Sequence, residues 1–539
     1  MIRPEVRRSP SGTKSGAAIA HGMKGTLRHV FTVGGLTAFS RVLGLVREML
    51  QSRLIGAGVE QSAFALAFAI PNMARKLFGE GALTAAFVPV FKGEVEREGL
   101  AKAERLARAV VTMMLLMLAA ILTLVFLGLF GVAQAPCFAG LREDPYRFRI
   151  TFRLVSVLLP YMLAICGAAF GMGVLNALGK FKASSFMPAL LNVIWIAALA
   201  ALLFFPSMPL DRRVVWVAGA ILLGGFLQLA FMFRCMAKVG VRPLPSFSGW
   251  RSEKVRIVWR NTAIAAVGAG AVQINYMLDQ VLAQYAAPWA AGVIGYAERL
   301  MDLPLGVIGV AFGTVLLPTF SGCFARGDAA AAKEALASSF RNMMTVMLPA
   351  GFGLFVLAPE ITAVIYEGNA FDAVATVRVA RALAVYALGL GFFGCQKILV
   401  PWFQSQNDMK TPLRVSVCTV VVNAALNIAA VVCLPVEWRH VGLAVSTVFC
   451  AGLGCAILRT LAVRRNGPLC APGTVAFLVK VCLASAVMAG VLVFLKPCVR
   501  DWSRILALGV LVAAGVAAYA ALALSLGIAR KLRVGKLGR

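Results

Sequence analysis

Charged residues are scarce in this chain. Asp, Glu, Lys and Arg make up 14% of the 539 residues, whereas soluble domains average about 25%. Hydrophobic residues make up 60%, and the mean hydropathy is +0.84. A soluble fold could not bury so much apolar surface, so the composition excludes an ordinary soluble enzyme or binding domain. Apolar runs of about 20 residues, long enough to cross a bilayer, predict a polytopic membrane protein.

Residues and motifs that often carry chemistry are scarce too. The histidines number only three (His21, His29 and His440) and lie far apart, which argues against a histidine-based metal site. The 12 cysteines form no CxxC pair, and no GxSxG, HExxH or Walker motif occurs, so no catalytic set is recognisable. The net charge is +30, but the basic residues are spread over short loops without a nucleic-acid-binding motif. Nucleic acid is therefore not an expected partner.

The apolar segments number about fourteen and predict an all-α chain. With both termini inside, the inner connections collect most of the Lys and Arg, while the link AQYAAPWAAG between spans seven and eight holds none. This bias predicts an N-in, C-in topology. The segments fall near residues 28–55, 60–91, 107–135, 150–177, 184–206, 213–235, 257–284, 288–320, 338–366, 376–403, 412–434, 440–463, 473–496 and 504–529.

An internal repeat divides the chain. GALTAAFVPVF resembles VAFGTVLLPTF and aligns Pro89 with Pro318, while GKFKASS resembles NDMKTPL and aligns Lys182 with Lys410 at nearly the same offset. Two related six-helix lobes in parallel orientation, followed by two C-terminal helices, are therefore expected, a transporter pattern with the substrate site between the lobes. The predicted parts are a basic cytoplasmic tail at 1–26, an N-lobe at 27–240, a C-lobe at 241–466, and the last two spans with a basic tail at 467–539.

The stretch SRVLGLVREMLQSRL places charges where the first span should be. At 100° per residue, Arg41, Arg47 and Glu48 share one polar arc of about 120°, and only Arg53 lies off it. One interpretation is an interfacial helix lying flat on the membrane. The other is a spanning helix whose polar arc lines an internal cavity.

Two further charged segments favour the cavity. IPNMARKLFGEGAL carries Arg75, Lys76 and Glu80 in the second span, and GYAERLMDLP carries Glu298, Arg299 and Asp302 in the eighth. These spans are related by the repeat, so one shared polar cavity explains both.

The guanidinium fork suits phosphate because it forms paired hydrogen bonds. The carboxylates are expected to hold the arginines or to form gates, and static structural ion pairs are the alternative. The candidate anion-binding residues are Arg41, Arg47, Arg75 and Arg299, and the candidate gating or ion-pair residues are Glu48, Glu80, Glu298 and Asp302.

Asp279, in INYMLDQ, is an isolated acid inside the seventh span. An unpaired carboxylate at membrane depth is costly, so a partner is expected. The alternatives are a bound cation, contact with Asp408 and Gln404 at the start of span eleven, or a protonated, hydrogen-bonded structural role.

The same charged segments resemble the MurJ/MviN family of lipid II flippases, in the multidrug/oligosaccharidyl-lipid/polysaccharide exporter superfamily. The resemblance covers about residues 27–530. The chain departs from the family where relatives read GAGxxTDAF, because GAGVEQSAF has Ser62 at the acid's position and Glu60 two residues earlier. The motifs are FSRVLGLVRE, LIGAG, AFAIPNMARKLFGEGALTAAFVPVF, YAERLMDLPLGVIGVAFGTVLLPTFS and DMKTP.

The resemblance implies fourteen helices in the bacterial inner membrane and no enzyme activity. It implies flipping of undecaprenyl-pyrophosphate-linked peptidoglycan precursor by alternating access, with cell-wall synthesis or division proteins as partners and with coupling to a monovalent cation or the membrane potential. Asp279 and Asp408 match the cation-binding region of some relatives. The family's essential cavity residues match Arg41, Arg47, Arg75 and Arg299, with Glu48 after the second.

Three alternatives remain at this point. A drug exporter, or an exporter of another polyprenyl-linked oligosaccharide, would belong to the same superfamily, and a drug exporter predicts an aromatic and acidic cavity. A membrane scaffold or receptor would not need paired charges at membrane depth. A membrane enzyme would need a catalytic set that the sequence lacks.

Overall fold

The computed structural model describes residues 35, 39–79, 81–134, 144–242, 244–469 and 473–528. Within these ranges the chain is almost entirely helical, and its one β-type contact is an isolated bridge between Gly368 and Phe371. The prediction of an all-α fold is therefore confirmed. The predicted tail at 1–26 and Glu80 lie outside the described residues.

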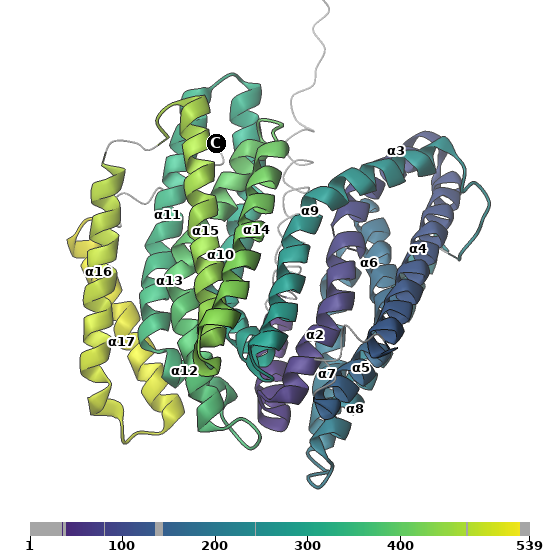
Figure 1. Ribbon diagram of the computed structural model, residues 1–539. Coiled ribbons are helices and arrows are strands. Elements are labelled where there is room, and N and C mark those ends of the chain that lie inside the picture. Colours follow the sequence, from purple (N-terminus) through teal and green to yellow (C-terminus); the bar gives the residue numbers. More distant parts are fainter. Residues whose placement is uncertain are drawn as a thin grey trace, which may run out of the picture.

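The first half of the chain packs around one apolar core (Figure 1). Phe87 and Phe170 lie at its centre with ring centroids 4.7 Å apart. Its helices are residues 39–55, α2 (Val59–Ala74), the π-helix η1 (Arg75–Gly79), α3 (Ala82–Glu98), α4 (Leu100–Gln134), α5 (Pro145–Leu158), α6 (Tyr161–Ala177), α7 (Phe181–Leu202) and α8 (Leu210–Ala237).

A second core forms from the following helices. Trp402 is fully buried there and packs edge-on against Phe320, 5.4 Å away. The helices are α9 (Glu253–Ala286), α10 (Ala290–Ala325), α11 (Ala329–Val356), α12 (Ala358–Tyr366), α13 (Ala373–Gln404), α14 (Lys410–Cys433), α15 (Val436–Asn466), and then α16 (Thr474–Leu495), the short η3 (Pro497–Val499) and α17 (Arg504–Ser525) at the edge.

Helix α9 belongs to both cores. Val255 and Val258, near its start, are buried in the first core, whereas Ala283 and Ala286, near its end, are buried in the second. Its 34 residues span about 50 Å at 1.5 Å per residue. Figure 1 shows α9 running between the two groups of helices, so this helix connects them.

Ion pairs attach the start of α9 to the first half of the chain. Lys254 Nζ binds Glu94 and, at 2.7 Å, Glu98. Earlier in the chain, in the connection before α9, the backbone N–H of Ser246 donates to Thr112 Oγ1 at 2.7 Å. The start of α9 is therefore attached to α3, and the connection before it to α4.

The predicted count of fourteen spans is not confirmed. In the described part of the chain, nine helices are long and apolar enough to cross a membrane, or ten if α11 and α12, which are bent by 76°, form one span. The four other predicted spans (28–55, 60–91, 257–284 and 288–320) are helical where they are described. They are also the spans that carry the charges selected from the sequence.

Close packing of α6 against α8 generates a stability prediction. A Cβ at Gly225 would lie 2.4 Å from the ring of Tyr161, and overpacking of this kind costs about 1–3 kcal/mol. Gly225→Ala should therefore lower the thermal midpoint of the purified protein. Gly219→Ala, on the same helix with no atom within 4 Å of the added Cβ, is the matched control and should not lower it. Equal midpoints would contradict the packing argument.

Candidate functional site

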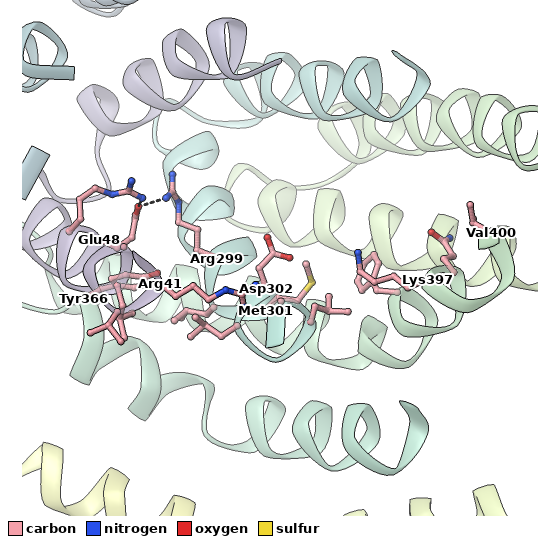
Figure 2. A pocket seen from close by; sticks show the side chains of 18 residues that line it. Arg41, Glu48, Arg299, Met301, Asp302, Tyr366, Lys397 and Val400 are labelled. Atoms are coloured by element: carbon pink, nitrogen blue, oxygen red, sulfur yellow. Dashed lines mark hydrogen bonds and ion pairs between the residues drawn. The ribbon is translucent and has the colours of Figure 1, made fainter. Parts of the chain in front are cut away.

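A cavity of about 970 Å³ lies between the helix at 39–55, α10 and α13. Figure 2 shows charged side chains from all three helices around it. Four of the lining residues are basic and two are acidic, so the site favours an anion. These residues are Arg41, Arg47, Arg299 and Lys397, with Glu48 and Asp302.

The polar arc of the first helix faces this cavity. Arg41, Gly44, Arg47 and Glu48 line it, and Glu48 is only 5% exposed. A helix lying flat on a membrane would instead turn its charges to water. The placement agrees with the cavity interpretation of the opening charges.

Glu48 is the central acceptor of the site. Its Oε1 accepts hydrogen bonds from the guanidinium groups of both Arg47 and Arg299. Arg47 also donates to Asn192 Oδ1 at 2.9 Å, and its guanidinium lies 4.3 Å from the ring centroid of Trp195. The carboxylate of Glu48 thus connects the first helix to α10, and Arg47 extends the contact to α7.

Arg41 is differently placed. Its Nη1 would lie 3.0 Å from a Cβ at Gly306, so the guanidinium packs on the bare backbone of α10. Among the described residues, no hydrogen bond or ion pair engages it. Its donors are available to a ligand in the cavity.

The sequence analysis missed three residues of this site. Lys397 lines the cavity and interacts electrostatically with Asp302. Asn192 and Trp195 hold Arg47. A lone lysine or asparagine inside an apolar run is itself a sign of function in a membrane helix, and this sign could have identified Lys397 and Asn192.

Two predicted residues lie off the cavity. Arg75 sits in the π-helix η1 and donates to Asn72 Oδ1 at 2.8 Å, one turn earlier. Glu298 is half-buried, and its charged neighbours are Asp279, Asp302, Arg299 and Lys76. The structure therefore brings together Arg41, Arg47, Arg299, Glu48 and Asp302, but not Arg75 or Glu298.

Asp279 has partners other than those predicted. Its Oδ1 accepts from Asn427 Nδ2 at 2.7 Å, and its Oδ2 accepts from Asn275 Nδ2 at 3.1 Å. Asn427 also donates to Asn423 Oδ1 at 2.6 Å. The acid is thus part of an amide network between α9 and α14.

The pairing of Asp279 with Asp408 and Gln404 is wrong. Asp408 lies at the start of α14, whereas Asn427 lies 19 residues later, about 28 Å along the helix. Asp408 instead accepts from Thr411 Oγ1 at 2.6 Å and pairs with Arg465. Among the described residues, no group of three or more His, Cys, Asp or Glu is placed to hold a metal.

Comparisons with known proteins agree on one family. The model of the family described as "Lipid II flippase MurJ" matches residues 51–513. The chain belongs to the MurJ family. A MurJ relative from Rhizobium tropici, named "Probable lipid II flippase MurJ", is 33% identical over 90% of this chain and 89% of its own length. A relative from Burkholderia cenocepacia, named "Lipid II flippase MurJ", is 32% identical over 86% of this chain and 89% of its own length.

Solved structures share the fold. "Lipid II flippase MurJ, inward closed conformation" matches with a TM-score of 0.74 and 21% identity over 93% of this chain and 99% of that one. An inward-facing MATE family transporter of the MOP superfamily matches with a TM-score of 0.62 and 14% identity over 81% and 99%. This chain therefore shares its fold with both of these solved transporters.

The observed contacts of Asp408 with Thr411 and Arg465 predict how stability depends on pH. Partial burial opposes ionisation, but the hydrogen bonds from Thr411 and the ion pair with Arg465 lower the pKa of Asp408 to about 2. A carboxylate with a lowered pKa stabilises the fold above the unfolded-state pKa of about 4, and this contribution is lost as the pH falls towards 2.

Asp408→Asn should therefore lower the thermal midpoint at pH 7. The difference in thermal midpoint between this variant and the wild type should become smaller between about pH 4 and pH 2. Arg465→Gln, which removes the ion-pair partner, should show a similar narrowing. A difference in thermal midpoint that stays constant over this pH range would contradict stabilisation of the fold by the ionised Asp408.

Proposed function

We propose that this chain is a lipid II flippase that moves the undecaprenyl-pyrophosphate-linked disaccharide-pentapeptide from the inner to the outer leaflet. Membership of the MurJ family supports the substrate. The observation that carries the chemistry is the arginine-rich cavity, because a pyrophosphate needs several cationic donors and the polyprenyl tail needs none.

The pyrophosphate would dock first on the donors that the protein leaves unused. Arg41 is the first of these, and Lys397, which lines the same cavity, adds a second positive charge. The Arg299 side chain is 39% exposed, so it can turn from Glu48 to the ligand. Arg47 is held by Glu48, Asn192 and Trp195, and it would fix the geometry of the site.

Glu48 would act as the competitor of the substrate. The anion displaces it from Arg299 on entry, and after release the carboxylate binds both arginines again. This exchange resets the cavity because the two arginines would otherwise repel one another at membrane depth.

Alternating access would come from motion between the proposed lobes at 27–240 and 241–466. Most of each apolar core lies in one lobe, with the start of α9 packed in the first core, and Glu48 joins the lobes through side-chain contacts. The lysine- and arginine-rich connections between helices support the N-in, C-in topology in the inner membrane. The tail would remain in lipid beside α16 and α17.

An exporter of drugs is the second candidate. The match to a MATE family transporter supports it at the level of the fold alone. The lining of the cavity favours the flippase, since among the described residues it has two aromatic side chains, Tyr366 and Phe393, and more basic residues than acids.

Removing Arg41 tests the anion site. Arg41→Ala should lower the affinity for lipid II by about 10- to 100-fold and abolish flipping in proteoliposomes, because a hydrogen bond to a charged group contributes about 1.5–3 kcal/mol. Arg47→Ala should abolish flipping too. Arg234→Ala, an exposed arginine of α8 away from the cavity, is the matched control. Full transport by the Arg41 and Arg47 variants in correctly inserted protein would overturn the anion site.

Neutralising Glu48 separates binding from turnover. Glu48→Gln removes the carboxylate that competes with the substrate for Arg299. The variant should therefore bind lipid II at least as tightly as the wild type but flip it more slowly, since the reset step is lost. Binding isotherms and initial flipping rates give the two quantities. Loss of binding with an unchanged maximal rate would contradict this role.

A further inference from the structure

Tightly packed backbone adjoins the cavity at Tyr366, one of its lining residues. Side chains along the first helix become buried from Gln51 onward, and Gly56 follows with a φ of +80°. A Cβ at Gly56 would lie 2.3 Å from the carbonyl oxygen of Ala370. The N–H of Ala370 in turn donates to Arg53 O at 3.0 Å. We call residues 51–62, 284–296 and 366–371 the outer seal.

Ser62 occupies the centre of this seal. It is fully buried, and its Oγ accepts a hydrogen bond from the backbone N–H of Gly292 at 3.0 Å. Its own carbonyl accepts from Gln284 Nε2 at 2.8 Å. Ser62 in α2 therefore contacts the end of α9 and the start of α10.

The bond to Gly292 is of the kind that caps a helix. The first N–H groups of a helix have no partner within it, and a capping oxygen normally accepts from the second or third residue. Gly292 is the third residue of α10, and the preceding Trp289 makes no side-chain capping bond. The cap of α10 is thus supplied by another helix.

Space at Gly292 limits this contact to a small residue. A Cβ there would lie 3.0 Å from the side chain of Gln61 and 3.3 Å from Ser62 Oγ. Gln61 is itself bound by Gln51 Nε2 at 3.0 Å. The cap therefore requires α2 and α10 to lie close together at this point.

Neutral groups make all of these contacts. Tyr296 donates its hydroxyl to Gly56 O at 3.1 Å, and the hydroxyl of Ser52 donates to Tyr366 O at 3.2 Å. Charged groups bind at the edge of the seal, where Glu60 accepts from Tyr146, Arg147 donates to Gln284 and Glu367 pairs with Arg504. Among the described residues, no ion pair joins α2 to α10, so parting these two helices separates none.

We propose that Ser62 is the positioning residue of the outer seal, and that it closes the cavity by capping α10 from α2. It holds α10 so that Arg299, two turns further along, faces Glu48. The neutral hydroxyl takes the place of the acid that the family pattern GAGxxTDAF has at this position. The term "outer", and the transport consequence, rest on the proposed function; the capping contact does not.

Hydrogen exchange of the full-length protein in lipid nanodiscs tests the cap directly. In Ser62→Ala the N–H of Gly292 loses its acceptor, so peptides covering 287–296 should exchange about two- to tenfold faster, the range expected for one neutral hydrogen bond. Ser62→Asp offers an acceptor to the same N–H, next to the positive end of the helix dipole, and should restore the protection.

Ser339→Ala is the matched control, because Ser339 is a buried serine whose hydroxyl has no partner among the described residues. It should leave the exchange at 287–296 unchanged. Unaltered exchange in Ser62→Ala, or acceleration spread equally over α4 and α8, would overturn the proposal. This readout needs no substrate, so it is independent of whether the chain flips lipid II.

Discussion

The hydrogen bonds of Glu48 to Arg47 and Arg299 are the interaction on which the site depends. Two guanidinium groups within reach of one another in a membrane protein repel strongly, and one carboxylate makes their proximity tolerable. The same carboxylate joins helices from the two apolar cores. Charge compensation and contact between the halves are therefore one interaction in this molecule.

This arrangement explains why the charges lie where they do. Among the described lining residues of the cavity, basic residues outnumber acids, so the proposed anion would offset the excess positive charge. In the proposed mechanism the anion and Glu48 compete for the same donors, which would link occupancy of the cavity to contact between the halves. At the other end of the same helix, the seal around Ser62 is neutral and tightly packed. Electrostatics thus governs the interior of the cavity, while close packing governs its closure.

Much of the fold could be predicted from the sequence, because apolar runs and loop charges are direct consequences of the bilayer. The polar arc of Arg41, Arg47 and Glu48 followed from helical geometry alone. The partners of Asp279 did not, since residues of α9 and α14 meet at a register that periodicity does not fix. Asp408, at the start of α14, was too far along the helix to reach it.

Other features depended on contacts between distant helices. A lone lysine in an apolar run marks Lys397 as unusual, but its place in the cavity depends on α13 packing with that face towards α10, which the sequence does not show. In the sequence, Ser62 stands where the family pattern has an acid, which suggested that a functional carboxylate had been lost. In the structure its hydroxyl accepts a hydrogen bond from the backbone N–H of Gly292, and so supplies an acceptor at the start of α10, where Trp289 supplies none.

The central claim is that the cavity binds the pyrophosphate of a lipid carrier. The most direct measurement compares the affinities of undecaprenyl pyrophosphate and undecaprenol for the purified protein in nanodiscs of neutral lipid. Two or more charge-assisted hydrogen bonds predict that the pyrophosphate form binds about 100-fold more tightly or better, with the difference shrinking as salt rises. Equal affinities for the two lipids would contradict the account.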